Sequence, residues 1–136
     1  MTLPTQQNIL DDLAFFDDWE QRYQYIIDLG KSLPALPEQL KTEALLVKGC
    51  QSSVWLSARF SNDVLTFEAA SDAIIVNGLV AIVLAAYQHQ TPAAILAFDI
   101  DRYLKTLDLE RHISQTRGNG LRAIVSKIKA IAKSYA

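Results

Sequence analysis

Several residue types that support common classes of small protein are scarce in this sequence. Its 136 residues include one Cys, two His, five Gly and four Pro. A single thiol forms no disulfide within the chain, and there is no CxxC pair or His/Cys cluster of the kind that binds zinc or iron. The low glycine and proline content excludes collagenous and disordered chains. We therefore expect one domain over residues 1–136 that folds on its own core, without a metal or other cofactor.

Excess positive charge and long apolar runs are also lacking. Thirteen Lys and Arg residues face 15 Asp and Glu residues, for a net charge of −2 and a pI near 5.6. Nucleic-acid binding depends on clustered cations, so DNA and RNA are not expected partners. The most apolar run, residues 73–86, contains Asn77 and Gly78 and is shorter than the ~20 residues that span a bilayer. It predicts a buried core element and no membrane anchor.

The N-terminal sequence lacks the cationic start and the unbroken apolar stretch of a secretory signal peptide. Free thiols are typical of compartments in which glutathione keeps cysteines reduced. We therefore expect the protein in the cytoplasm.

Charge is unevenly distributed between the two ends of the chain. Residues 1–20 contain five acidic residues and no Lys or Arg, whereas residues 117–136 contain five basic residues and no Asp or Glu. Acidic residues favour the N-terminal turns of helices and basic residues the C-terminal turns, which explains the pattern most simply. A charge pattern that binds a partner is the alternative.

Helical periodicity is clearest toward the two ends of the chain. Apolar residues over 16–30 repeat at helical spacing, and Asp17 and Glu20 have the spacing of a capping box. Pro34 and Pro37 end that helix and predict an ordered surface connector. Further helices are predicted over residues 91–97, 102–107 and 121–135, the last of them after a glycine-containing start at residues 118–120.

Strand-like alternation occupies the middle of the chain. Residues 54–60 and 64–69 alternate between apolar and polar side chains, and the turn residues 61–63 between them predict a β-hairpin. Residues 44–48 add a third predicted strand. An apolar helix over 73–89, capped by Ser71 or Asp72, follows. The expected fold is α+β, with a small antiparallel sheet of about three strands and helices packed on one face.

Cys50 is the residue best suited to chemistry. It lies between Gly49 and the polar run 51–53, where one apolar segment has ended and the next has not begun. That position predicts a loop, in which a neighbouring glycine allows close backbone approach and nearby N–H groups favour the thiolate. One thiol accepts or hands on a single group, but it cannot hold an iron–sulfur cluster alone. A buried thiol that acts as a small apolar side chain is the alternative.

Other candidate chemistry is weaker. A Cys-His hydrolase requires His89 or His112 to reach Cys50, and both histidines lie in polar surroundings typical of solvated residues. Asp99 and Asp101 form a carboxylate pair only if their segment is extended. The glycines at 118–120 complete no nucleotide-binding fingerprint.

The sequence around Cys50 resembles the SufE family of cysteine desulfuration proteins, and the similarity extends over nearly the whole chain. Ser53 and the pair at 118–119 depart from the family's usual residues. The segments that carry the resemblance are WEQRYQYIIDLGKSLPALP at 19–37, GCQSSVW at 49–55, SDAIIVNGLVAIVL at 71–84, TPAAILAFD at 91–99 and RGNGL at 117–121.

The resemblance implies a SufE/IscU-like fold and a role as sulfur acceptor in iron–sulfur cluster assembly. In that role Cys50 takes persulfide sulfur from a PLP-dependent cysteine desulfurase of the SufS type, stimulates that enzyme and passes the sulfur to a scaffold such as SufBCD. Gly49 and Gln51 then flank the acceptor, Asp72 is the acidic residue near the active loop, and Arg117 is the arginine before the last helix. The protein itself is then a sulfur carrier with a covalent persulfide and not a stand-alone enzyme.

This role sets two structural expectations. A persulfide in open solvent is lost to small thiols or oxidised, so we expect an apolar pocket that shelters Cys50. The loop that begins at Gly49 must also extend into the desulfurase. Three matters stay open: a desulfurase of the CsdA type as the partner, a non-catalytic adaptor role, and the choice between monomer and homodimer.

Overall fold

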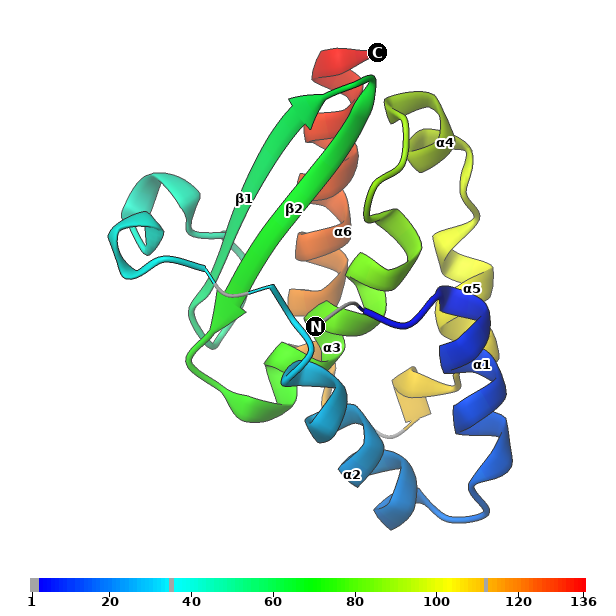
Figure 1. Cartoon of the computed structure of the whole chain (residues 1–136). Helices are drawn as coiled ribbons and strands as arrows, with labels where there is room; N and C mark the ends of the chain where they lie inside the picture. The colour runs from blue at the N-terminus through cyan, green and yellow to red at the C-terminus, as the bar shows by residue number, and fades with distance from the viewer. Residues whose placement is uncertain (1–2, 35, 112) are drawn as a thin grey trace.

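The structure, a computed structural model, describes residues 3–34, 36–111 and 113–136. It is a mixed α+β fold, as expected, in which the helices α3 and α6 lie beside a hairpin (Figure 1). The elements in chain order are α1 (Gln6–Phe15), α2 (Trp19–Gly30), the 3-10 turns η1 (Glu38–Leu40) and η2 (Glu43–Leu45), β1 (Val54–Ser61), β2 (Val64–Ser71), α3 (Ile74–Tyr87), α4 (Pro92–Ala97), α5 (Ile100–Thr106), the 3-10 turn η3 (Leu109–Arg111) and α6 (Gln115–Tyr135).

The predicted hairpin is confirmed. Strands β1 and β2 pair antiparallel, in a register that joins Val54 to Ser71 at one end and Ser61 to Val64 at the other. Asn62 and Asp63 form the turn at positive φ, 53° and 66°. These residue types tolerate left-handed backbone better than most, and the resulting turn matches the twist of the strands.

The third strand predicted over residues 44–48 is wrong. Within the described residues the sheet has two strands, and η2 occupies the start of this segment. One isolated bridge, between Leu46 and Trp55, joins the segment to β1, together with a 2.8 Å bond from Val47 N–H to the carbonyl oxygen of Val54. The short apolar run fits helix and strand equally well, and the turns on either side leave room for a single contact with the sheet.

Helix α3 is the centre of the fold and contacts α1, α2, α6 and β2. It is buried on most sides, as its composition predicted. Gly78 lets the backbone of α2 cross it directly: a Cβ at this position would overlap the carbonyl oxygen of Ile26 and lie 2.6 Å from its Cγ2. This crossing packs α3 closely against α2, and the same helix supplies Val76 and Leu79 to the cavity described below.

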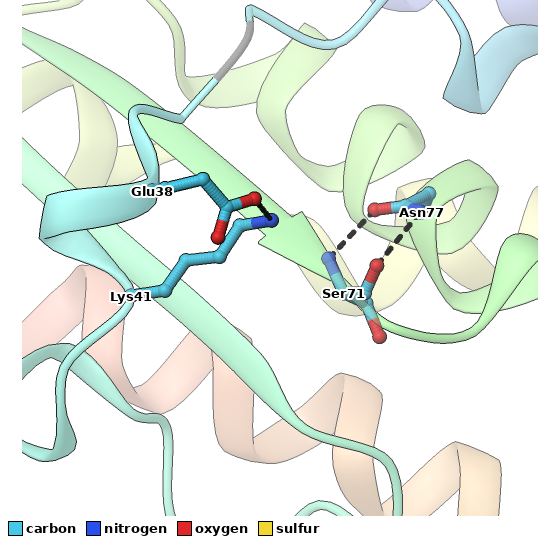
Figure 2. A network of polar contacts seen from close by, with 4 residues as sticks. All are labelled: Glu38, Lys41, Ser71 and Asn77. Carbon is cyan, nitrogen blue, oxygen red and sulfur yellow. Dashed lines mark hydrogen bonds and ion pairs between the residues drawn. The ribbon is translucent and has the colours of Figure 1, made fainter.

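Two amide side chains of the α3 region bind the outer edge of β2. Asn77 accepts from Ser71 N–H at 2.8 Å and donates to the Ser71 carbonyl oxygen at 3.1 Å, as Figure 2 shows. Gln88 pairs in the same way with the backbone of Phe67, at 2.6 and 2.8 Å. These bonds satisfy edge groups that an unpaired strand would otherwise offer to another chain.

The predicted start of the apolar helix is corrected by one or two residues. Helix α3 begins at Ile74 behind an Ala73 N-cap, and neither Ser71 nor Asp72 caps it. Ser71 is still at the end of β2, where Asn77 holds its backbone and its Oγ accepts from Ala73 N–H at 3.2 Å. Pairing with β1 holds Ser71 in the strand, and a bond from Asp72 N–H to the carbonyl oxygen of Ser53 holds Asp72 beside it, so neither residue caps the helix.

The starts of α2 and α6 also differ from the sequence patterns, and one helix was not predicted. Helix α2 is capped by Asp18, which accepts from Gln21 N–H at 2.8 Å, so the Asp17 to Glu20 box is not used. Helix α6 begins at Gln115 behind Ser114, so the glycines at 118–120 lie inside it. Helix α1 was not predicted, because within it only Ile9 and Leu13 are buried and its apolar pattern is weak.

The connector after α2 is ordered by local contacts. Lys41 pairs with Glu38 at 2.8 Å (Figure 2), and its ammonium lies 5.8 Å from the ring centroid of Trp55 on β1. These contacts hold η1 near the start of the sheet, a few residues ahead of the cysteine loop.

Candidate functional site

Cys50 lies in the loop between η2 and β1, as the sequence predicted. Gly49 precedes it at φ 96°, in the left-handed region that favours glycine. A Cβ at Gly49 would also lie 3.2 Å from the Cβ of Ala123 on α6. The loop therefore leaves η2 by a backbone turn pressed against α6.

The Cys50 thiol is half-buried between α3 and α6. Its Sγ donates to the carbonyl oxygen of Gly120 at 3.5 Å, across 70 residues of sequence. A small cavity of about 70 Å³ adjoins the thiol. Apolar side chains of α3 and α6 line it together with polar residues of the loop and of the first turn of α6: Gln51, Ser52, Val76, Leu79, Thr116, Arg117, Gly120, Leu121 and Ile124.

Burial raises the pKa of the Cys50 thiol above its ordinary value. Desolvation is the cause, because it disfavours the charged thiolate. In the position that the structure shows, the thiol is therefore protonated near neutral pH and a poor nucleophile.

We predict that Cys50 in the folded protein reacts with iodoacetamide several-fold more slowly than in the urea-unfolded chain. An exposed cysteine has a pKa of about 8.5, and burial displaces the folded profile to higher pH. Alkylation followed by intact-mass spectrometry over a pH series measures both profiles. Coincident folded and unfolded profiles would show that the thiol is open to solvent at rest.

The C-terminal side of the loop is anchored to the end of β2. The carbonyl oxygen of Ser53 accepts from Ser71 Oγ at 2.7 Å and from Asp72 N–H at 3.3 Å. Ser71 is itself held by Asn77 (Figure 2). The loop thus has a glycine pivot at one end and a hydrogen-bonded anchor at the other, with Cys50 between them.

The structure gathers some of the predicted site residues around the thiol and leaves another outside. Gln51 and Arg117 line the cavity. Asp72 is exposed and does not line it, and its backbone N–H is what binds the loop. Arg117 is in the first turn of α6, where Ser114 Oγ accepts from its N–H at 3.2 Å, so its expected place before the helix is corrected by a turn.

Several residues around the thiol were not singled out by the sequence patterns. Val76, Leu79, Leu121 and Ile124 supply the apolar walls, and Gly120 supplies the acceptor for the thiol. The four apolar residues lie at helical spacing, which by itself indicates core positions and not a site. The signal that groups them is the resemblance itself, since its segments at 71–84 and 117–121 contain four of these five positions.

The hydrolase alternative receives no support from His89. His89 follows α3 at φ 58°, and its Nδ1 lies 3.3 Å from Thr66 Oγ1 on the hairpin. Helix α3 rises about 1.5 Å per residue, which separates its Val76 and Tyr87 ends by roughly 16 Å. His89 is beyond the far end, while Val76 lines the cavity. His112 lies outside the described residues.

The carboxylate pair considered from the sequence does not form. Asp99 is the N-cap of α5 and accepts from Arg102 N–H at 3.1 Å, so its segment is not extended and the condition for a pair with Asp101 is not met. Over residues 3–34, 36–111 and 113–136, no three His, Cys, Asp or Glu side chains gather as metal ligands would. No helix in these ranges is long and apolar enough to cross a bilayer.

The fold and site together define a small α+β protein with a single loop thiol beside a small, partly apolar cavity. Residues 7–132 match the family model SufE, described as an Fe–S metabolism associated domain. The chain belongs to the SufE family, and this membership connects it with iron–sulfur metabolism.

Curated relatives and a solved structure agree with this assignment. A SufE-like protein of Rhizobium etli is 46% identical over 129 residues, covering 92% of this chain and 87% of the relative. One of Rhizobium meliloti is 45% identical over 129 residues, covering 92% of each. The solution structure of a hypothetical protein from Thermus thermophilus has a TM-score of 0.78 at 19% identity, covering 98% of this chain and 97% of the other, and shows the same fold.

Proposed function

We propose that this protein carries sulfur as a persulfide on Cys50. The donor is a PLP-dependent cysteine desulfurase of the SufS or CsdA type, and the recipient is an iron–sulfur scaffold of the SufBCD type in the cytoplasm. The observation that carries the proposal is the position of the chain's single cysteine, in a loop with a glycine pivot and beside a small, partly apolar cavity. The SufE family's connection with iron–sulfur metabolism supports it.

The transfer is a thiol–disulfide type of exchange. The Cys50 thiolate attacks the outer sulfur of the donor's persulfide, a new S–S bond forms on Cys50, and the donor's S–S bond breaks. The donor cysteine leaves as a thiolate and takes up the proton that Cys50 gave up. Two sulfur centres exchange one neutral sulfur atom, so the step requires no external oxidant or reductant.

The resting loop must open for this attack. The half-buried thiol has a raised pKa and donates to the Gly120 carbonyl oxygen, so it is both shielded and protonated. Rotation about Gly49, with Ser53 kept in place by Ser71 and Asp72, brings the sulfur outward. Solvation then returns the pKa of the thiol toward its ordinary value and raises the thiolate fraction.

The cavity has a role after the transfer. Its volume of about 70 Å³ exceeds the ~30 Å³ that a water molecule occupies in the liquid, so one added sulfur atom fits beside Cys50. Apolar walls limit contact of the persulfide with solvent thiols and oxidants. Arg117, on the rim of the same cavity, offers positive charge to the persulfide anion. The loop that carries the sulfur depends on Gly49 as its pivot, on Gln51 beside the thiol, and on the Asp72 N–H that binds the Ser53 carbonyl oxygen.

We expect the wild-type protein to gain the mass of one sulfur atom when it is incubated with a desulfurase, PLP and L-cysteine. Intact-mass spectrometry measures the gain, which dithiothreitol should reverse because it reduces persulfides. Incubation without L-cysteine is the control. Absence of the gain with every SufS- and CsdA-type desulfurase tested, each shown to be active alone, would refute the proposal.

A further inference from the structure

Helix α6 concentrates positive charge in an acidic protein. Over Gln115–Tyr135 it has five basic side chains and no acidic one, while the whole chain carries −2. The dipole argument accounts for basic residues in the last turn of a helix, but Lys133 alone is in that turn. The dipole does not account for the other basic side chains of α6, which are Arg117, Arg122, Lys127 and Lys129.

Part of this charge borders an open groove next to the cysteine loop. The groove, of about 800 Å³, lies between residues 43–48 and α6. Ala44, Val47 and Ala123 give it apolar walls, and the exposed side chains of Lys48 and Lys127 border it from its two sides. Glu43 is the one acidic residue among its lining residues.

The basic residues of the groove are not neutralised within the structure. The ion pairs found over residues 3–34, 36–111 and 113–136 are those of Lys31 with Asp28, Lys41 with Glu38 and Arg111 with Asp108. Lys48 and Lys127 are in none of them. A carboxylate from another molecule can therefore approach both without displacing an internal partner.

The groove is continuous with the loop that holds Cys50. Ala123 lines the groove and is also the residue against which Gly49 packs, with 3.2 Å between its Cβ and the position of a Cβ on Gly49. Lys48 immediately precedes that glycine. A segment bound in the groove thus contacts the residue before the pivot and brings the molecule to which it belongs against the thiol.

We propose that this groove docks an acidic segment of the protein that donates sulfur to Cys50. The inference rests on the proposed function and names the chemistry of the donor's contact: carboxylates placed between Lys48 and Lys127, with small apolar side chains against Ala44 and Ala123. A nucleic acid is disfavoured, because the apolar walls and Glu43 oppose a phosphate backbone. Contacts of exposed charges act mainly on encounter and orientation, so the effect is on affinity more than on the transfer itself.

The test is charge reversal at Lys127 with a matched reversal elsewhere on α6. We expect Lys127→Glu to raise the protein concentration for half-maximal stimulation of the desulfurase by about tenfold at low ionic strength. Lys133→Glu makes the same change of charge in the last turn of α6, outside the groove. This variant should change the half-maximal concentration far less. The maximal rate and the sulfur mass gain at saturating donor should match wild type for both variants, since neither touches Cys50 or its cavity.

Salt provides a second readout. The screening length falls from about 30 Å at 0.01 M to about 3 Å at 1 M, so the difference between Lys127→Glu and wild type should shrink as salt is added. The docking inference is overturned if the two reversals have equal effects, or if neither changes the half-maximal concentration. In either case a mass gain of the wild-type protein would still support the proposed function. If wild type itself gains no sulfur, the proposed function fails, and the inference with it.

Discussion

Replacing Cys50 by serine should abolish sulfur acceptance and desulfurase stimulation while leaving the fold intact. A serine hydroxyl forms no S–S bond, and at neutral pH it is not ionised, so no slower version of the transfer remains. We expect a complete loss of stimulation, so that desulfurase turnover with the variant equals that of the desulfurase alone. The free energy of unfolding should change by no more than about 1 kcal/mol, because the site is half-buried and a hydroxyl can still donate to the Gly120 carbonyl oxygen.

The measurement combines desulfurase turnover, intact mass and a thermal melt for wild type, Cys50→Ser and Cys50→Ala. Alanine removes the donor to Gly120 as well as the sulfur, so it separates the hydrogen bond from the chemistry. If Cys50→Ala still binds the desulfurase and stimulates it fully, the protein is an adaptor and Cys50 merely packs against α6. If both variants bind but do not stimulate, the sulfur atom is the functional group.

Substitution of Gly78 by alanine should strongly destabilise the fold. The added methyl group would overlap the carbonyl oxygen of Ile26 and crowd its Cγ2 at 2.6 Å, so α2 and α3 must move apart along a buried crossing. Overpacking of this kind costs about 3 kcal/mol, which corresponds to a fall in Tm of about 10 °C for a domain of this size. Because α3 supplies Val76 and Leu79 to the Cys50 cavity, the resting thiol should also become more reactive.

Gly118→Ala is the matched control. Gly118 is also a buried helix glycine, but the nearest atom to its added Cβ is the guanidinium of Arg122 at 3.8 Å. In open helical geometry the exchange should stabilise by about 0.5 to 1 kcal/mol, because alanine loses less backbone entropy on folding. Urea melts of the two variants measure both shifts. A Gly78→Ala variant as stable as wild type would show that the helices do not cross as closely as described.

Local sequence patterns were reliable where one segment alone decides its structure. The turn residues Asn62 and Asp63 and the alternation on either side predict the hairpin. The Thr91-Pro92 start predicts α4, where Thr91 Oγ1 accepts from Ala94 N–H at 3.1 Å. In both cases the stabilising contacts join residues a few positions apart, so the local sequence indicates them directly.

Patterns failed where a distant element competes for the same residue. Ser71 was expected as a helix cap, but pairing with β1 and the Asn77 amide hold it in the strand. Residues 44–48 were expected as a strand, but the turn of η2 and the pivot at Gly49 allow one bridge to β1. Helix α1 has a weak apolar pattern, with Ile9 and Leu13 as its buried residues, and its contact with the distant helix α3 is not visible in the local sequence.

The amino-acid sequence by itself determined that thiol chemistry in this chain depends on a single cysteine. It also indicated that this cysteine follows a glycine in a loop, and that the surrounding motifs resemble one family. Only the tertiary structure decided how deeply the thiol is buried, which carbonyl it binds, and that a groove with basic borders begins beside its pivot. The physical reason is distance along the chain: Cys50 meets Gly120 across 70 residues. The burial of the thiol, its pKa and the shape of the cavity depend on such contacts between residues far apart in the sequence. No single segment therefore encodes them.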